Sequence, residues 1–466
     1  MLSPIGLTAA KPLPENFQWG NMQSSLDSAI DFSRLDNFVR EFQTTGFTEL
    51  VLALKSNSDW ASVSVNGLIV ENPAPKPEYM DAYEEWVFSI VERYDGDGTD
   101  DMPGLLFPVR FYEIGSEFSS YEPEPVEEYL AVLERAYAAA HRAYDNVIVA
   151  HAAFLTTLAF VNHPTPPEYE AAFESDADQT HSLADMRQVL DRPDLFDVVN
   201  VHALGDPYEI ESIVAWLNYE MGQRGYRKRI ILSDTGTTPF IAWGPATACD
   251  RDPNWMGRIV PPATEADRCR LAEYFNQLVN GDEQTLRWVQ AFSAADIVKK
   301  VLVAADQGIF LINTAFTEDL LWLKLPIIQA GAGNSAWAGL VDVERREYRP
   351  GYYALQQLIG YLRDYESITR HPFDDDGIRV YELVRENRRI WIAWYDPNYL
   401  VLPNDPIPKT TVTLDVGGTT IAIETLITQA EQSIPERAGL QTRDGTITFD
   451  LTPTPIFIIS DETIQQ

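Results

Sequence analysis

The stretch PVRFYEIGSEFSSYEPEPVEEYLAVLERAYAAAHRAYDNVIVAH (Pro108–His151) predicts the fold of most of this chain. Its two ends, Pro108–Ile114 and Asn146–His151, are short runs rich in β-branched and aromatic residues, which are typical of strands. Between them, apolar residues recur with the spacing of a helix, at Val126, Tyr129, Leu130, Leu133 and Tyr137. A strand, a helix and a second strand in this order indicate the βαβ unit of a parallel sheet.

The same alternation extends from near the N-terminus to about residue 360. The predicted strands are Phe17–Gln23, Glu49–Leu54, Pro108–Ile114, Asn146–His151, Phe196–His202, Arg229–Asp234 and Gly308–Asn313. These are seven strands, whereas a closed (β/α)8 barrel needs eight. The residues before Phe17 contain three prolines and are too few for both a strand and a helix. We therefore predict an α/β fold, a (β/α)8 TIM barrel whose first βα unit is missing.

After residue 368 the pattern changes to short strands separated by Gly, Pro, Asn and Asp. They are IRVYELV (378–384), RRIWIAWY (388–395), TVTLDV (411–416), TIAIETLI (420–427), TITFDL (446–451) and PIFII (455–459). Short strands at such regular spacing are typical of a β-sandwich. We predict two domains, a barrel over residues 1–368 and an all-β sandwich over residues 369–466.

The chain is strongly acidic, since 35 Lys and Arg stand against 70 Asp and Glu among 466 residues, a formal net charge of −35. Binding to a phosphate backbone requires clustered cations, so we expect no nucleic-acid partner. Neutral substrates approach such a surface without repulsion. The sequence contains no run of about 18 apolar residues, so it predicts no membrane span. The N-terminus lacks the pattern of a signal peptide. The oligomeric state does not follow from the sequence.

Cys249 and Cys269 are the two cysteines of the chain. If they pair, the bridge closes a loop of about 20 residues and stabilises the fold by about 3 kcal/mol. A disulfide would favour an oxidising, extracytoplasmic compartment, whereas two separate thiols would carry no such information. Both interpretations stay open at this point.

Catalytic groups of parallel α/β barrels lie at the carboxyl ends of the strands. Glu117 follows the predicted strand Pro108–Ile114 and stands near the aromatic residues Tyr112 and Phe118. Partial desolvation there would raise the pKa of its carboxyl group and suit it to act as a general acid. The alternative is a solvated loop glutamate.

Three further polar residues stand at strand ends. Asp234 ends the strand Arg229–Asp234, where a carboxylate can serve catalysis or accept hydrogen bonds from backbone N–H groups. Asn200 and His202 end the strand Phe196–His202. A histidine in such a place more often makes structural or substrate hydrogen bonds than acts as a base.

The order of several stretches resembles that of clan A glycoside hydrolases. FYEIGSEFSS (111–120) is similar to the strand-4 motif of these enzymes, an aromatic residue with Glu-x-x-Asn-Glu, in which the last Glu is the acid/base. RIILSDTG (229–236) resembles their strand 7, which carries the nucleophilic Glu. Residues 30–47, 196–202 and 339–358 resemble the segment after strand 2, strand 6 and the closing segment of the barrel. The resemblance covers nearly the whole chain from about residue 17.

The resemblance implies a glycosidase with Glu117 as acid/base, Asp234 as nucleophile and a carbohydrate as substrate. Three residues depart from the family pattern. Ser116 replaces the Asn that hydrogen-bonds the sugar 2-hydroxyl, Asp234 replaces Glu, and Leu204 replaces an aromatic residue.

The shorter side chain of Asp234 leaves three hypotheses open. Retaining enzymes hold their carboxyl groups about 5–5.5 Å apart, and losing one methylene widens this by about 1.5 Å. The result, about 6.5–7 Å, reaches the lower edge of the inverting range of about 6.5–9.5 Å. The protein is then a retaining hydrolase with an adapted backbone, an inverting hydrolase with Asp234 as base, or a catalytically inactive carbohydrate-binding or scaffold protein.

Sugar recognition also requires aromatic faces and polar groups. The candidate substrate-binding residues are Ser116, Tyr112, Asn200, His202 and four tryptophans in predicted loops, Trp60, Trp243, Trp322 and Trp337. The sequence contains no HExxH, CxxC, EF-hand, P-loop or GxGxxG motif. We therefore expect no metal and no cofactor.

Overall fold

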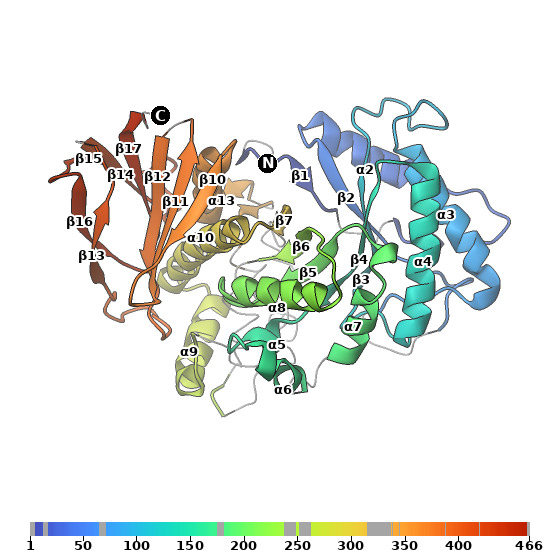
Figure 1. The fold of residues 1–466 in the computed structure, drawn as a ribbon, viewed down its shortest axis with the longest axis horizontal. Coiled ribbons are helices and arrows are strands. Elements are labelled where there is room, and N and C mark those ends of the chain that lie inside the picture. Colours follow the sequence, from blue (N-terminus) through green and yellow to red (C-terminus); the bar gives the residue numbers. More distant parts are fainter. Residues whose placement is uncertain are drawn as a thin grey trace.

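The structure is a computed structural model and describes residues 5–12, 17–64, 71–174, 181–236, 248–250, 262–314, 337, 339–343, 345–386, 388–418 and 420–463. Figure 1 shows a helix-covered α/β part beside a β-rich part that carries the C-terminus. Within the residues described, no helix combines the length and the apolar character that a membrane span requires.

Seven strands form one parallel sheet in chain order, and the sheet curls into a nearly closed barrel. They are β1 (Ala9–Ala10), β2 (Glu49–Leu54), β3 (Phe111–Glu117), β4 (Ile148–Leu155), β5 (Val199–Ala203), β6 (Ile230–Thr235) and β7 (Leu311–Thr314). Side chains from both ends of this sheet meet inside the barrel, since Leu311 of β7 and Ala9 of β1 contact one buried cluster that includes Val51 and Phe111. The predicted barrel is confirmed, with seven strands in the described part of the chain.

The chain before β2 differs from the prediction. Residues 17–23, which we predicted as a strand, contain helix α1 (Trp19–Met22), and the first strand lies earlier, in β1. The N–H of Trp19 donates to the carbonyl of Lys55, 3.1 Å away, and its ring packs edge-on against Trp60 at 5.0 Å. The apolar residues of this segment are therefore buried against the loop after β2 instead of being paired in the sheet.

Helices cover the outside of the barrel (Figure 1). In α4 (Val126–Ala143), one face is buried, including Tyr129 and Leu133, while Glu127 and Glu128 in the first turn are exposed. This is the amphipathic pattern of a helix that packs on a sheet. The others are α2 (Ser33–Thr44), α3 (Met80–Arg93), α5 (Thr157–Phe160), α6 (Tyr169–Glu174), α7 (Leu183–Leu190), α8 (Glu209–Gln223), α9 (Arg268–Val279), α10 (Glu283–Asp306) and α13 (Pro350–Leu362), with 3-10 turns at Pro77–Tyr79, Pro166–Glu168, Pro193–Leu195 and Glu265–Asp267.

Helix α10 joins the barrel to the β-rich part, and most of its residues from Val289 to Ala305 are buried. Two adjacent lysines on it point to different partners. Lys299 Nζ lies 2.6 Å from Asp396 Oδ1 in the β-rich part, and Lys300 Nζ donates to the carbonyl of Gly236, just past β6. The helix therefore connects the end of strand β6 to the second part of the molecule.

The β-rich part contains an antiparallel six-stranded sheet and a two-stranded sheet, in the orders β10-β11-β12-β17-β14-β15 and β13-β16. The strands are β10 (Ser367–His371), β11 (Ile378–Arg385), β12 (Arg388–Tyr395), β13 (Thr410–Asp415), β14 (Thr420–Thr425), β15 (Arg437–Gln441), β16 (Thr446–Leu451) and β17 (Ile456–Thr463), and β8 (Val341–Asp342) pairs with β9 (Glu347–Tyr348) before them. On β12, Trp391 belongs to the core between these sheets, while Trp394 belongs to the core shared with the barrel. The predicted all-β region is confirmed, and the division at residue 368 stays a prediction.

Cys249 and Cys269 form a disulfide, with their Cα atoms 4.3 Å apart. Cys249 lies in the segment after β6, and Cys269 lies in the first turn of α9. The bridge therefore ties the connection after β6 to the helix that follows it.

Candidate active site

Three strands bring Glu117, His202 and Asp234 together at the carboxyl end of the barrel. Glu117 is the last residue of β3, His202 lies near the end of β5, and Asp234 lies near the end of β6. Asp234 is paired in register with His202. Because the carboxyl ends of neighbouring parallel strands meet at one rim, residues far apart in the sequence share one site.

Glu117 is largely buried, with 8% of its surface exposed, and is hydrogen-bonded to a histidine. Its Oε1 lies 2.6 Å from His202 Nδ1. The register between β3 and β4 shifts between Ile114 and Glu117, and Gly115 within this irregularity has φ +92°. Such a backbone conformation is strained for any residue with a Cβ. The glycine therefore sets the direction in which Glu117 leaves the strand.

The carboxyl group of Glu122 hydrogen-bonds to the backbone at this irregularity of β3. Its Oε1 accepts a hydrogen bond from the N–H of Ser116 at 2.7 Å, and its Oε2 accepts one from Asn72 Nδ2 at 2.7 Å. Burial raises the pKa of Glu122 to about 8, although both hydrogen bonds oppose the increase. We did not predict Glu122 from the sequence, because nothing in the loop YEPEP distinguishes one acidic residue from the next.

Asp234 is half-buried, and its Oδ1 is buried without a hydrogen-bond partner among the residues described. Burial raises the pKa of Asp234 to about 6, whereas the charges of His202 and Lys11 lower it and those of Glu117 and Glu113 raise it further. This carboxyl group therefore changes its charge near neutral pH. Its Oδ1 therefore keeps an unused capacity to accept a hydrogen bond among the residues described.

Below the rim, the barrel interior holds a charged network that we did not predict. Glu113 of β3 is fully buried, and its Oε2 lies 2.5 Å from Lys11 Nζ. Its Oε1 accepts hydrogen bonds from Asn200 Nδ2 at 2.8 Å and from Ser233 Oγ at 3.3 Å. Glu113 and Glu117 each have a carboxyl oxygen within 3.9 Å of the His202 ring, so they face the same site. No local signal in the sequence identifies Lys11 as its partner.

Two predicted substrate-binding residues form hydrogen bonds with other protein groups. Asn200 is fully buried and donates to Glu113 and to the carbonyl of His151. His202 is 3% exposed, and both of its ring nitrogens have protein partners, Glu117 and Ser233. This geometry favours a role in holding neighbouring side chains over direct contact with a sugar.

Tyr112 requires a correction. It is fully buried in the core between sheet and helices, whereas its neighbour Phe111 belongs to the cluster inside the barrel. Successive side chains of a strand point to opposite faces, so Tyr112 points away from the side of Glu113 and Glu117. Tyr112 therefore presents no surface to a ligand at the rim.

The predicted tryptophan platforms differ in their surroundings. Trp60 is half-buried, donates from Nε1 to the carbonyl of Gln23 at 2.8 Å and packs against Trp19. Trp337 is 3% exposed and packs edge-on against Phe275 at 5.9 Å, so it is buried instead of offering a ring face to a ligand. The other two predictions, Trp243 and Trp322, lie outside the described residues. The half-exposed Ser116 stands directly beside Glu117.

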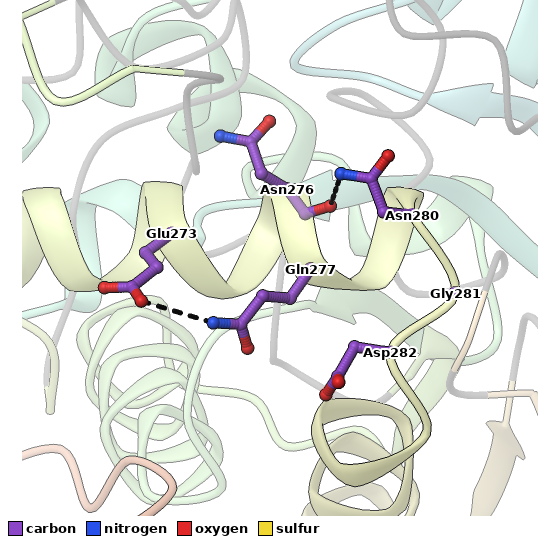
Figure 2. A pocket seen from close by; sticks show the side chains of 6 residues that line it. All are labelled: Glu273, Asn276, Gln277, Asn280, Gly281 and Asp282. Atoms are coloured by element: carbon purple, nitrogen blue, oxygen red, sulfur yellow. Dashed lines mark hydrogen bonds between the residues drawn. The ribbon is translucent and has the colours of Figure 1, made fainter.

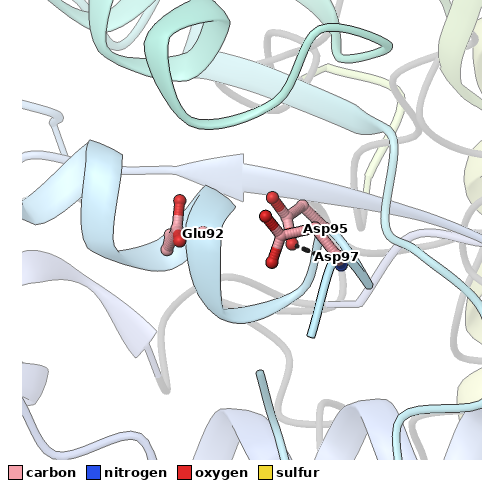
Figure 3. A group of neighbouring side chains, drawn as sticks. All are labelled: Glu92, Asp95 and Asp97. Atoms are coloured by element: carbon pink, nitrogen blue, oxygen red, sulfur yellow. Dashed lines mark hydrogen bonds between the residues drawn. The ribbon is translucent and has the colours of Figure 1, made fainter. Parts of the chain in front are cut away.

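Two polar features lie outside this site. Figure 2 shows a surface hollow of about 700 Å³ at the junction of α9 and α10, lined by Glu273, Asn276, Gln277, Asn280, Gly281 and Asp282. Figure 3 shows Glu92, Asp95 and Asp97, whose carboxylates place one oxygen each within 4.8 Å of the others. Asp95 also accepts a hydrogen bond from the N–H of Asp97 at 3.0 Å, which is the ordinary contact of a turn. We assign no metal to this acidic group.

Comparisons with known proteins give similarity in structure. No protein-family model and no curated protein sequence matches this chain. A family 39 glycoside hydrolase from the gut symbiont Bacteroides cellulosilyticus WH2 aligns with 99% of this chain and 76% of its own, at 11% identity and a TM-score of 0.59. A glucosidase from Croceicoccus marinus aligns over 98% and 90%, at 11% identity and a TM-score of 0.56. A family 30 endoxylanase from Clostridium papyrosolvens C71 aligns over 98% and 90%, at 9% identity and a TM-score of 0.53.

At these identities the similarity concerns the fold, and a barrel fold hosts many activities. The alignments include both the barrel and the β-rich part, because they cover 98% or more of this chain. The chain therefore has the fold of the clan A glycoside hydrolases, a TIM barrel followed by an all-β region, in agreement with the resemblance of its strand-end motifs.

Proposed function

We propose that this protein is a glycoside hydrolase that acts on a neutral glycoside or polysaccharide, with Glu117 as acid/base and Asp234 as nucleophile or base. The observation that carries the proposal is the difference between two carboxyl groups at one barrel rim. Glu117 is hydrogen-bonded to a histidine, whereas Asp234 has a pKa of about 6 and an unpaired oxygen among the residues described. Glycoside hydrolysis requires two carboxyl groups whose environments separate their roles.

The two groups divide the reaction as follows. Glu117 gives its proton to the glycosidic oxygen, so that the leaving sugar departs as a neutral alcohol. Asp234 is ionised above pH 6 or so and either attacks the anomeric carbon or removes a proton from an attacking water. The product configuration distinguishes these paths, since direct attack by Asp234 gives retention and attack by water gives inversion.

The charge of the protein supports an uncharged substrate. With a net charge of −35, the protein repels anionic polymers, so an uncharged sugar is the substrate that approaches most easily. Ser116, beside Glu117, and Trp60 are the described residues that we propose to contact the sugar. A glucosidase and an endoxylanase are among the proteins of similar fold.

The test is hydrolysis of a panel of aryl glycosides and neutral polysaccharides, with the first-formed anomer followed by NMR. Glu117→Gln removes the transferable proton and should abolish turnover of substrates with poor leaving groups, because no other acid replaces it. Glu41→Gln is the matched control, since Glu41 is an exposed carboxylate on α2. Equal turnover by Glu117→Gln and Glu41→Gln would exclude Glu117 as the acid.

A second candidate is a carbohydrate-binding or scaffold protein without catalysis. It is favoured by the two departures from the family pattern next to the reacting groups, Ser116 and Asp234. Calorimetric binding of oligosaccharides without turnover of any substrate would support it. Turnover that appears only in the Ser116→Asn/Asp234→Glu double variant would support it further, because that variant restores the family residues.

We also propose an extracytoplasmic location. The disulfide between Cys249 and Cys269 supports it, because disulfides persist mainly in oxidising compartments. Fractionation of the native host cell, followed by labelling of free thiols, tests this: an intracellular protein with two reduced cysteines would contradict it.

A further inference from the structure

The ring of His202 lies between carboxyl groups. Its Nδ1 is 2.6 Å from Glu117 Oε1 on one side. On the other side its Nε2 is 3.0 Å from Ser233 Oγ and 3.9 Å from Glu113 Oε1. The side chain is 3% exposed, so bulk water does not screen these charges.

The charged groups around this ring come from three elements. Lys11 follows β1, Glu113 and Glu117 lie on β3, and Asp234 lies on β6. From β4, His151 approaches the same strand, but it accepts the N–H of Asn200 instead of contacting the His202 ring. Within the described part of the chain, three carboxyl groups thus surround His202, and the one cation among these neighbours, Lys11, is paired with Glu113 at 2.5 Å. The charge of the groups around the ring is therefore net negative.

We propose that His202 is the proton store of Glu117: as an imidazolium it holds the proton on Nδ1 and passes it to Glu117 when the glycosidic bond breaks. The inference rests on the proposed function, because it assigns the source of the proton that Glu117 donates. His202 acts through Glu117 and is a positioning residue, and Ser233, Glu113 and Lys11 in turn hold His202.

The proton cycle balances in each step. The imidazolium gives its Nδ1 proton to the Glu117 carboxylate, which becomes a carboxylic acid beside a neutral imidazole. Glu117 then protonates the glycosidic oxygen as the C–O bond breaks and the leaving alcohol departs. In a retaining reaction, Glu117 takes a proton from the water that releases the sugar from Asp234, and returns it to His202. In an inverting reaction, Asp234 takes a proton from the attacking water and later releases it to solvent, and solvent returns one proton to the imidazole.

The buried side of the ring fixes which nitrogen faces Glu117. Glu113 is anchored by Lys11 and Asn200, and Ser233 Oγ lies within hydrogen-bond distance of both Glu113 and His202. A negative charge 3.9 Å from Nε2 favours a proton on that nitrogen. The mobile proton is then the one between Nδ1 and Glu117 Oε1, 2.6 Å apart.

The first experiment does not depend on activity. The ¹⁵N NMR spectrum of the full-length protein with labelled histidine distinguishes protonated from unprotonated ring nitrogens, and the chain has only six histidines. The His202→Gln variant identifies the His202 signals. His371 is the matched control, because it also faces a glutamate, Glu382, at 2.7 Å but lies in the β-rich part. We expect His202 to carry protons on both nitrogens at pH 7, and a neutral His202 at pH 7 would overturn the proposal.

The second experiment uses the pH dependence of kcat/KM. In His202→Gln the amide still hydrogen-bonds to Glu117 but stores no proton, so we expect the alkaline limb to move about one pH unit toward acid. In His371→Gln we expect no movement. An alkaline limb unchanged in His202→Gln would overturn the proposal even if kcat falls, since a purely structural loss lowers the rate without moving the limb.

A double variant tests the buried side. Lys11→Met/Glu113→Gln removes both charges together and leaves neither unpaired, so we expect the fold to persist and the ¹⁵N signals of His202 at pH 7 to move toward those of a neutral ring. An unchanged His202 titration would remove Glu113 and Lys11 from the proposal. A protonated His202 without turnover of any substrate would refute the proposed function and proton delivery together, whereas turnover with a neutral His202 would refute this inference alone.

Discussion

Replacing Gly115 by alanine tests the geometry that holds Glu117. Gly115 has φ +92°, and a Cβ built there would lie 2.6 Å from Glu122 Oε1 and 3.0 Å from the Cβ of Ala152. An L residue in the left-handed region costs roughly 1–2 kcal/mol. The new Cβ must also displace the Glu122 carboxyl group, which breaks its hydrogen bond from the N–H of Ser116. Leaving buried polar groups unsatisfied costs about 1–3 kcal/mol.

The expected loss for Gly115→Ala is therefore about 2–5 kcal/mol of unfolding free energy. Gly46→Ala is the matched control, because Gly46 has φ +107° but a Cβ added there would meet no described atom within 4 Å beyond its chain neighbours. It should lose only the backbone contribution, about 1–2 kcal/mol. Guanidinium unfolding followed by tryptophan fluorescence measures both variants.

The same substitution should reduce turnover beyond its effect on stability. Glu117 lies two residues after Gly115, and a displacement of about 1 Å in a reacting group costs about 100-fold in rate. We expect kcat/KM of Gly115→Ala to fall by about that factor under conditions where the variant is fully folded. If Gly115→Ala and Gly46→Ala lose the same stability, the contact with Glu122 does not control this bend and the reasoning is refuted.

Three further predictions concern stability and pH. Cys249→Ser/Cys269→Ser opens a loop with a sequence separation of 20 and should lose about 3 kcal/mol in chemical unfolding, a loss that disappears if the wild type is measured in reductant. The pKa of Asp234 is raised from 3.8 to about 6, so its proton stabilises the folded state below pH 4 or so and this contribution is lost as the pH rises through about 6. Asp234→Asn should therefore be more stable than the wild type by up to about 3 kcal/mol at pH 8 and by little at pH 3.5; an equal difference at both values would contradict the assignment. Asp396→Ala removes the carboxylate paired with Lys299, whose side chain is 9% exposed, and should lose about 3 kcal/mol; a loss below about 0.5 kcal/mol in thermal or chemical unfolding would show that the pair does not stabilise the contact between the two parts.

The periodicity of the sequence was sufficient for most of the barrel. Strand β3 and helix α4 follow from alternating and 3.6-residue patterns, and both patterns arise from local geometry. Glu117 and Asp234 could be chosen because strand ends are recognisable in the sequence and strand ends form the rim. The same local information failed at residues 17–23, because a short apolar segment is buried equally well by a strand or by a short helix.

Side-chain direction was partly predictable and partly not. The alternation of β3 already places Tyr112 opposite Glu113, so the correct face of Tyr112 could have been predicted. The surroundings of Trp337 could not, because its partner Phe275 lies on helix α9, far away in the sequence. Its burial depends on how two distant segments pack.

The sequence by itself determined the class of fold, the position of two carboxyl groups at strand ends and the all-β character of the C-terminal region. Only the tertiary structure decided which groups surround them. Lys11 Nζ donates a hydrogen bond to Ser233 Oγ at 3.4 Å although 222 positions separate the two residues, and the hydrogen-bonded His202 and Glu117 are 85 residues apart. Helix and strand patterns depend on neighbours within a few residues. The charges and the burial that decide which group carries a proton depend on contacts that form only when the barrel closes.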